Sequence, residues 1–365
     1  MELKEKVKRL PSCPGVYLMK DASGSVIYVG KSKNLKSRVG SYFVNSKDHP
    51  PKVVKLVKHL KDFEHIVTDT EFEAFLMECR LIKELQPLYN RLMKNQRSYC
   101  YIKVALSEKY PDITISEKSC ENDGNVYFGP YTSRNTVLRG LDGIKAHLGI
   151  FCTSPSQKNS SCLNHSLGLC IGRCSADFPQ ERYRAILDSI ISLIQGRDKE
   201  IIKEMQANME KASERLDFES AARYRDCLRD VNYLVSKARV IDYTGRNRNI
   251  AVIEYIDDEN IKCFLIKGSS VLSGERYNIR QHGPERLKDL LKSDALAFFS
   301  NTSGKSSLRI GRYEIDEAQI IYSYLKNKCD SRRHAVIPEK WLKAPYTQKL
   351  DGVFDKLLVF PDQPV

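Results

Sequence analysis

Two short apolar runs on either side of a polar turn open the chain. Residues 15–18 (GVYL) and 26–29 (VIYV) are rich in β-branched and aromatic residues, which favour strands. Residues 21–24 (DASG) between them include a glycine that can adopt a positive φ. This pattern predicts an antiparallel hairpin.

Helical spacing of apolar residues predicts four helices around the hairpin. They cover residues 1–10, the basic segment 31–38, residues 52–60 and residues 71–85, and a strand is expected at 63–68. The last helix should end before Pro87, because proline cannot continue a helix. Its expected buried stripe consists of Phe72, Phe75, Leu76, Cys79, Ile82 and Leu85.

The middle of the chain changes from strands to helices. Short strands are expected at residues 101–104 and 113–115, and a helix at 135–147. Continuous helical periodicity then extends from residue 179 to about 239, with a break at Leu216 and Asp217. The pattern predicts a hairpin of two antiparallel helices over about residues 199–237.

The last part of the chain has a weaker pattern. Residues 250–255 and 261–266 resemble a strand pair joined by an acidic turn. Helices are expected at 284–292 and 316–326, with a strand at 295–299 between them. These elements predict a small α/β domain.

Length supports a division into several domains. A chain of 365 residues should hold two to four units, on a prior of about 100–200 residues each. The predicted fold class is therefore α+β multidomain. The expected boundaries are 1–97, 98–178, 179–239 and 240–365.

Charge points to a polyanionic partner. The net charge is +13, and residues 1–100 contribute +8 of it (19 Lys and Arg minus 11 Asp and Glu). Nucleic acid is a better candidate than a membrane, since no stretch approaches the roughly 20 apolar residues of a spanning helix. The N-terminus has no signal-peptide core, so we expect a cytoplasmic protein whose eleven cysteines are thiols or metal ligands.

The hairpin and the basic segment carry candidate phosphate chemistry. Tyr17 and Tyr28 lie on the two expected strands and could present their hydroxyls on one side. Lys31 and Arg38 follow closely, and arginine matches the geometry of phosphate oxygens. The alternative is an ordinary hairpin with core tyrosines beside a solvated basic helix, and the residues alone do not decide between the two.

An ordered set of motifs resembles the GIY-YIG nuclease family. The set consists of Gly15-Val16-Tyr17, Tyr28-Val29-Gly30, and then Lys31, Asn34, Leu35, Arg38 and Tyr42. Residues 71–90 resemble the metal-binding helix of UvrC-type excinuclease subunits, with Glu78 at the metal position and Asn90 at the terminal asparagine. The segment has Arg80 and Gln86 where UvrC proteins more often have Asn and Arg.

This resemblance implies hydrolysis of a DNA phosphodiester bond with one metal ion. Its site residues would be Tyr17, Tyr28, Lys31, Arg38, Tyr42, Glu78 and Asn90. Glu78 would hold Mg²⁺ or Mn²⁺, and Arg38 would contact the phosphate. Tyr28 or Tyr17 would orient or deprotonate the attacking water, helped if Lys31 and the metal lower the tyrosine pKa. Tyr42 and Asn90 would orient the scissile group.

A glutamate on a helix is more often a surface charge or a salt-bridge partner than a metal ligand. Glu78, however, lies beside the apolar stripe of its helix, where a carboxylate is costly unless a charged group meets it.

Four cysteines within 23 residues form a second candidate site. They are Cys152, Cys162, Cys170 and Cys174. Such a cluster suggests a thiolate site for Zn²⁺ or an iron–sulfur cluster, with free thiols as the alternative. The spacing resembles the cysteine-rich region of UvrC proteins, which implies a [4Fe–4S] cluster of structural or redox-sensing role.

The predicted helical hairpin resembles the UVR motif shared by UvrB and UvrC proteins. The resemblance implies docking on UvrB, and the residues expected to contact it are Leu216, Phe218, Ala221, Ala222 and Arg225. A self-contained coiled coil is the alternative.

Three functions remain open at this point. The first is a nucleotide excision repair endonuclease that makes one incision, by resemblance on the 3′ side of a lesion, together with UvrB. The second is a stand-alone nuclease for branched or mobile-element DNA, and the third is a catalytically silent UvrB-binding adaptor. The ribonuclease-H-like and helix-hairpin-helix modules of full-length UvrC have no expected counterpart in these 365 residues.

Overall fold

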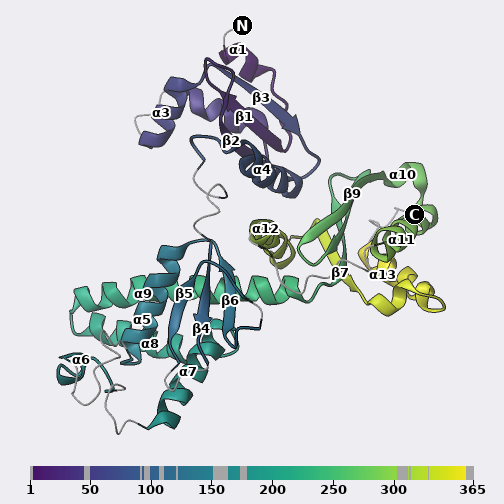
Figure 1. Cartoon of the computed structure of the whole chain (residues 1–365). Coiled ribbons are helices and arrows are strands. Elements are labelled where there is room, and N and C mark those ends of the chain that lie inside the picture. Colours follow the sequence, from purple (N-terminus) through teal and green to yellow (C-terminus); the bar gives the residue numbers. More distant parts are fainter. Residues whose placement is uncertain are drawn as a thin grey trace. The chain divides into compact units, whose positions relative to one another are not determined.

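The fold is that of a computed structural model of the chain (Figure 1). The structure describes residues 3–44, 50–90, 93, 99–106, 111–120, 122–150, 163–172, 179–301, 311, 314–327 and 329–358. The chain forms two compact units, residues 1–95 together with 243–365, and residues 96–242. The mixed α+β fold class is confirmed, whereas the four predicted domain boundaries stay predictions.

The first unit begins with a three-stranded antiparallel sheet, which we call the N-terminal sheet. Its order is β2-β1-β3, so the predicted hairpin is confirmed and β3 pairs with the other edge of β1. The strands are β1 (Gly15–Lys20), β2 (Val26–Ser32) and β3 (Asp62–Val67). The helices of this part are α1 (Leu3–Lys8), α2 (Leu35–Gly40), η1 (Ser41–Phe43), α3 (Pro51–His59) and α4 (Glu71–Leu85).

Helix α4 has the bounds that the sequence predicts, because strong local signals fix both ends. Thr70 and Glu73 form a capping box at its start, and Gln86 ends it in the left-handed conformation at φ 48°. Its expected buried stripe is partly wrong. Leu85 is 40% exposed, whereas Ala74 is fully buried against the N-terminal sheet. The helix has a second buried face, described below, that a single stripe does not capture.

The second unit combines a small sheet with a long helical region. The sheet order is β5-β4-β6, with β4 (Cys100–Val104), β5 (Ile113–Ser116) and β6 (Val126–Tyr131). The helices are α5 (Arg134–His147), α6 (Leu163–Ser166), α7 (Gln180–Ile194), α8 (Glu200–Glu214) and α9 (Phe218–Gly245). Asp217 accepts a hydrogen bond from the backbone nitrogen of Ser220 at 3.1 Å, as expected for a cap, and α9 extends past the predicted end.

The first unit also contains a four-stranded antiparallel sheet, the C-terminal sheet, of order β10-β7-β8-β9. Its strands are β7 (Asn249–Tyr255), β8 (Asn260–Lys267), β9 (Ser270–Asn278) and β10 (Arg332–Ile337). The helices are α10 (Ile279–His282), α11 (Pro284–Ser300), α12 (Ile315–Lys326) and α13 (Lys349–Leu357), with short η3 (Glu339–Leu342) and η4 (Tyr346–Gln348). Figure 1 shows these elements in green to yellow.

The predicted strand at residues 295–299 is wrong, because these residues belong to α11. Leu287, Leu291, Ala295 and Phe299 are buried at intervals of four residues, which is a helical spacing. Strands β9 and β10 were not predicted. Both carry polar or basic residues at positions where a strand pattern would need apolar ones.

Gly15→Ala should destabilise the N-terminal sheet. A Cβ at this position would lie 2.3 Å from the backbone oxygen of Ile66 on β3, so the two strands would have to separate. Overpacking of this kind costs about 1–3 kcal/mol, which thermal unfolding followed by circular dichroism would detect. Gly40→Ala is the control, since its Cβ would only make an ordinary 3.7 Å contact with Val7. Equal unfolding temperatures for Gly15→Ala and the parent would contradict this account.

Candidate active site

The two tyrosines of the hairpin lie on the same face of the N-terminal sheet. Tyr17 is opposite Gly30 in the β1–β2 register, and Tyr28 is two residues before Gly30, so the tyrosines are diagonal neighbours. Their ring centroids are 6.1 Å apart. A Cβ on Gly30 would lie 2.4 Å from the Tyr17 hydroxyl oxygen. Glycine is therefore required there because the buried Tyr17 side chain crosses directly over it.

Tyr42 and Arg38 join this group from the segment that follows β2. Asn34 caps α2 by accepting a hydrogen bond from the backbone nitrogen of Ser37 at 2.9 Å, which fixes where the helix begins. The Tyr42 hydroxyl lies 2.9 Å from the Tyr17 hydroxyl. The Arg38 guanidinium carbon lies 5.4 Å from the centre of the Tyr42 ring, and Arg38 is exposed at the edge of the group.

Burial raises the pKa of both hairpin tyrosines. For Tyr17 and for Tyr28 the largest cause is desolvation, and the neighbouring Tyr42 adds to it, while Arg38 opposes it. The largest contributions to these shifts do not include Lys31, whose ammonium is bound to Glu71 at 2.7 Å, and the lowering of a tyrosine pKa by a bound metal stays a prediction. The tyrosines are therefore protonated hydroxyls at neutral pH.

Lys31 joins the hairpin to helix α4 by two contacts. Its backbone nitrogen donates to Oε1 of Glu78 at 3.1 Å, and its Nζ forms the ion pair with Glu71 in the first turn of α4. The Lys31 ammonium also lies 4.5 Å from the centre of the Phe75 ring. The backbone nitrogen and the side-chain ammonium of Lys31 thus both bind residues of α4. These contacts place the Glu78 carboxylate beside the strand that carries Tyr28.

Glu78 is half-buried, and burial raises its pKa. The hydrogen bond from Lys31 and the charges of Lys31 and Arg38 oppose this shift. Among the described residues, no group donates a hydrogen bond to its second oxygen, Oε2. A partly desolvated carboxylate with one oxygen open suits a hard divalent cation that keeps most of its water ligands. No group of three or more His, Cys, Asp or Glu side chains within the described ranges is arranged to hold a metal ion.

Asn90 is buried against strand β2. Its Oδ1 accepts from the backbone nitrogen of Val29, and its Nδ2 donates to the oxygen of the same residue, both at 2.9 Å. The side-chain amide therefore replaces a neighbouring strand for Val29, between Tyr28 and Gly30 of the motif. A direct role of Asn90 toward a substrate stays a prediction.

Two residues at this site were not singled out from the sequence. Lys52 of α3 places its Nζ 5.5 Å from the centre of the Tyr28 ring, and Glu71 anchors the Lys31 ammonium. The basic helix expected at residues 52–60 is a sequence signal for Lys52. An acidic residue in the first turn of a helix usually indicates only a favourable interaction with the helix dipole, so the sequence gives no specific signal for Glu71.

The predicted thiolate site lies almost entirely outside the described residues. Cys152, Cys162 and Cys174 fall in segments that the structure does not describe, and only Cys170 can be placed. Cys170 is buried, and its backbone oxygen lies 3.0 Å from Nδ1 of His165.

The predicted UvrB-contacting residues gather at the junction of α8 and α9. Leu216 adopts a φ of 61° at this turn and is 72% exposed, and Phe218 is 66% exposed. Arg225 is also exposed and contacts Asp226, whereas Ala221 and Ala222 are half-buried. Two large apolar side chains therefore face solvent together at one end of this helix pair. Within the part of the chain that the structure describes, every helix is too short or too polar to cross a membrane.

Comparison with known families shows which families these segments are similar to. Three family models match successive segments: the UvrC-like GIY-YIG domain at residues 13–91, the UvrC/Cho excinuclease middle domain at 99–193 and the UvrB/uvrC motif at 199–231. In these three segments, the chain matches domains of the UvrC family. The resemblance inferred from the motifs is thus confirmed.

Curated UvrC relatives align along most of the chain. The UvrABC system protein C of Acetivibrio thermocellus is 34% identical over 345 residues, which are 93% of this chain and 55% of that protein. The protein of the same name from Caldanaerobacter subterraneus is 33% identical, over 93% of this chain and 56% of the relative. The chain therefore spans about half the length of the curated relatives it matches.

A solved domain of the UvrC family also aligns with the N-terminal part. The GIY-YIG N-terminal endonuclease domain of UvrC from Thermotoga maritima, bound to its catalytic divalent cation magnesium, is 37% identical. The alignment covers 25% of this chain and 97% of that domain, with a TM-score of 0.23.

Glu78→Gln should stabilise the metal-free protein at neutral pH. A carboxyl whose pKa is raised in the folded state stabilises the fold only while it is protonated, so stability falls as the pH rises above the ordinary value of 4.5. Glutamine keeps an acceptor for the backbone of Lys31 and carries no charge. Thermal unfolding in EDTA should therefore show a higher midpoint for Glu78→Gln at pH 7.5 and no difference below pH 4.5.

Glu84→Gln, an exposed site on the same helix, serves as the control and should match the parent at both pH values. A lower midpoint for Glu78→Gln than for the parent at pH 7.5 would contradict the burial argument.

Proposed function

We propose that this chain is a metal-dependent DNA endonuclease of nucleotide excision repair. The observation that carries the proposal is the placement of Glu78, whose half-buried carboxylate is bound to the backbone that follows the Tyr28-Val29-Gly30 motif. The GIY-YIG family match supports the same reaction class. The solved domain from Thermotoga maritima binds magnesium, which supports Mg²⁺ or Mn²⁺ as the ion.

Each residue of the site has a role that follows from its contacts. Glu78 holds the cation through its open oxygen, and the bound cation would stabilise negative charge on the phosphate and on the leaving oxygen. Arg38, which is exposed at the edge of the tyrosine group, binds the phosphate from the side opposite to the cation. Tyr28 or Tyr17 orients or deprotonates the attacking water; in the metal-free chain both are neutral hydroxyls, because burial raises their pKa.

Tyr42 and Asn90 support this arrangement. The Tyr42 hydroxyl is hydrogen-bonded to the Tyr17 hydroxyl at 2.9 Å, and the Arg38 guanidinium lies over the Tyr42 ring. Tyr42 therefore contacts both a tyrosine that acts on the water and the arginine that binds the phosphate. Asn90 fixes the backbone of Val29, which lies between Tyr28 and Gly30.

The substrate we propose is a DNA duplex that contains a lesion. The excess of basic residues in the first hundred supports backbone contacts that carry no sequence specificity. We propose that the site within residues 13–91 makes one incision, on the 3′ side of the lesion, as the family resemblance implies.

UvrB is the partner we propose for the helical hairpin. The UvrB/uvrC motif match at residues 199–231 supports it, as do the exposed Leu216 and Phe218 at the turn. Apolar side chains that face solvent at such a turn are typical of an interaction surface. The [4Fe–4S] cluster at Cys152, Cys162, Cys170 and Cys174, with Zn²⁺ as the alternative, stays a prediction.

Nicking of a lesion-containing duplex tests the endonuclease proposal. With Mg²⁺ or Mn²⁺ and UvrB, the parent should nick one side of the lesion. Glu78→Gln and Arg38→Ala should each lose about 10²-fold or more in rate, since each removes a group that stabilises transition-state charge. Glu84→Gln is the matched control on α4 and should nick at the parental rate.

The outcomes separate the alternatives. No nicking by the parent under any of these conditions, with UvrB still bound, would overturn the endonuclease proposal in favour of an adaptor. Nicking that is independent of UvrB would favour a stand-alone nuclease.

Phe218→Ala should weaken UvrB binding about tenfold or more in a titration of labelled UvrB, because exposed aromatic anchors often dominate an interface. Phe298→Ala, at a partly exposed phenylalanine of α11, is the matched control and should bind as the parent does. Equal affinities for both variants would show that the turn between α8 and α9 is not the docking surface.

A further inference from the structure

Helix α4 packs against both sheets of the first unit. Toward the N-terminal sheet it buries Ala74 and Ile82 among apolar residues of β1 and β2. On another face, Phe72, Leu76 and Cys79 are buried in a cluster with residues of β7, β8 and α12. The helix that carries Glu78 is therefore a shared element, and the C-terminal sheet covers the face that the N-terminal sheet leaves open.

Aromatic side chains fix how this second face of α4 packs against the C-terminal sheet and α12. The rings of Phe72 and Tyr324 stack at 3.8 Å with an interplanar angle of 7°. Phe264 meets the Phe72 ring edge-on at 5.1 Å. The Tyr324 hydroxyl donates to Oε2 of Glu254 at 2.5 Å, which fixes the ring in this position.

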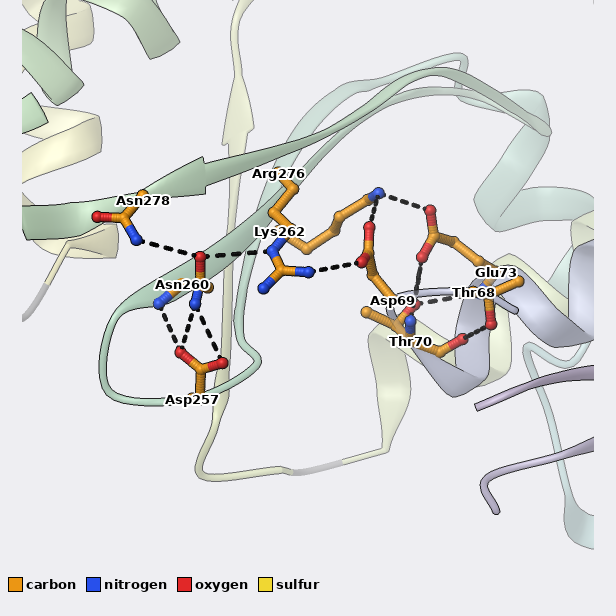
Figure 2. A network of polar contacts seen from close by, with 9 residues as sticks. All are labelled: Thr68, Asp69, Thr70, Glu73, Asp257, Asn260, Lys262, Arg276 and Asn278. Atoms are coloured by element: carbon orange, nitrogen blue, oxygen red, sulfur yellow. Dashed lines mark hydrogen bonds and ion pairs between the residues drawn. The ribbon is translucent and has the colours of Figure 1, made fainter. Parts of the chain in front are cut away.

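A buried lysine of β8 binds the start of α4 (Figure 2). The Nζ of Lys262 lies 2.6 Å from Oδ2 of Asp69 and 2.8 Å from Oε1 of Glu73. The Lys262 side chain is only 7% exposed. Arg276, its neighbour on β9, reaches the other oxygen of Asp69 at 3.2 Å. Burial lowers the pKa of Lys262, but the hydrogen bonds to the two carboxylates outweigh it and the net shift is upward.

Glu73 links this lysine to the capping box of α4. Its Oε2 accepts from the backbone nitrogen of Thr70 at 3.0 Å, while its Oε1 is bound to Lys262. The Thr70 hydroxyl accepts in turn from the backbone nitrogen of Glu73 at 3.2 Å. One carboxylate therefore closes the first turn of the helix and attaches that turn to the C-terminal sheet, as Figure 2 shows.

Two lysines from two different sheets thus hold the first turn of α4. Lys31 of β2 pairs with Glu71 and also donates its backbone nitrogen to Glu78. Lys262 of β8 pairs with Glu73. Glu78 follows Glu73 by five residues, about 7.5 Å along the helix axis. A shift or rotation of the helix start would therefore move the Glu78 carboxylate relative to the tyrosines.

We propose that Lys262 is a positioning residue for the metal site, through which the C-terminal sheet sets the placement of Glu78. The proposal rests on the function proposed above and assigns a role to the C-terminal sheet. Lys262 itself contacts no reacting atom. It acts through Asp69, Glu73 and the first turn of α4.

Binding of Mn²⁺ to the full chain, measured by electron paramagnetic resonance, tests this proposal without DNA. Lys262→Met keeps the length of the side chain and removes its charge, so the partly buried Glu73 carboxylate loses its cation and keeps only its hydrogen bonds from Thr70. The dissociation constant for Mn²⁺ should rise several-fold, less than the roughly tenfold or more typical when a direct outer contact of a metal ligand is lost, because Lys262 acts through Glu73. Lys262→Arg, which keeps the charge, should restore most of the affinity.

Lys288→Met is the matched control. Lys288 is also largely buried, at 18% exposure, and it bridges the carboxylates of Asp355 and Glu285 within the C-terminal part. It should bind Mn²⁺ as the parent does. Glu73→Gln is a second variant that keeps the capping box, because glutamine can replace glutamate there, and it should weaken Mn²⁺ binding in the same direction.

The Mn²⁺ dependence of nicking separates positioning from loss of folding. Positioning predicts that Lys262→Met needs more Mn²⁺ for half-maximal nicking and recovers at saturating Mn²⁺. A partly unfolded variant would instead lose maximal rate at an unchanged half-saturating concentration, and that result would overturn the proposal. Equal Mn²⁺ affinities for Lys262→Met and the parent would overturn it as well, while leaving the endonuclease proposal intact. Absence of Mn²⁺ binding in the parent would overturn the proposed function itself.

Discussion

The hydrogen bond from the backbone nitrogen of Lys31 to Glu78 is the contact on which the candidate site depends. It joins the strand that carries Tyr28 to the helix that carries the candidate metal ligand, at 3.1 Å. Several local features keep this contact in place. Gly30 lets Tyr17 cross the strand, Asn90 holds the backbone of Val29, and the Lys31 ammonium is bound to Glu71. These contacts fix the position of the β2 backbone relative to α4. The position of the Glu78 carboxylate therefore depends on the packing of the strand and the helix, and not on the rotation of its side chain alone.

Burial of Glu78 raises the free-energy cost of its negative charge. Because Glu78 is half-buried, its charge is costly in the absence of a partner, and its pKa is raised. Within the described residues, the Tyr17 and Tyr42 hydroxyls are hydrogen-bonded to each other, and the hydrogen bond to Glu78 comes from the backbone of Lys31. A bound divalent cation would relieve the cost of the charge. If Glu78 is the metal ligand, the charge of this carboxylate lowers the stability of the metal-free fold and favours binding of the cation, as is common at functional sites.

Local signals made the N-terminal part predictable. The glycine-containing turn, the apolar spacing over residues 71–85 and Pro87 predict the hairpin and the ends of α4, and the structure confirms both. The order of tyrosine, arginine and glutamate motifs led to the correct family. Long-range contacts were not predictable. Lys262 and Asp69 are 193 residues apart, and a lysine within an apolar strand does not reveal its partner.

Other differences arise because burial depends on the whole fold. Leu85 fits a helical stripe yet is 40% exposed, whereas Ile82 in the same last turn of α4 is buried. Residues 295–299 resemble a strand in isolation, but their spacing continues that of the preceding helical turns of α11. The tyrosine pKa values likewise depend on desolvation, which no short sequence pattern reports.

We propose that one half-buried carboxylate, Glu78, holds the cation, and anomalous scattering from crystals of the chain soaked in Mn²⁺ tests this assignment. If Glu78 is the ligand, a peak should lie within about 2.0–2.2 Å of its carboxylate, close to the tyrosine group, and should be lost in Glu78→Gln. A peak held by other side chains, or one that persists unchanged in Glu78→Gln, would show that Glu78 is not the metal ligand.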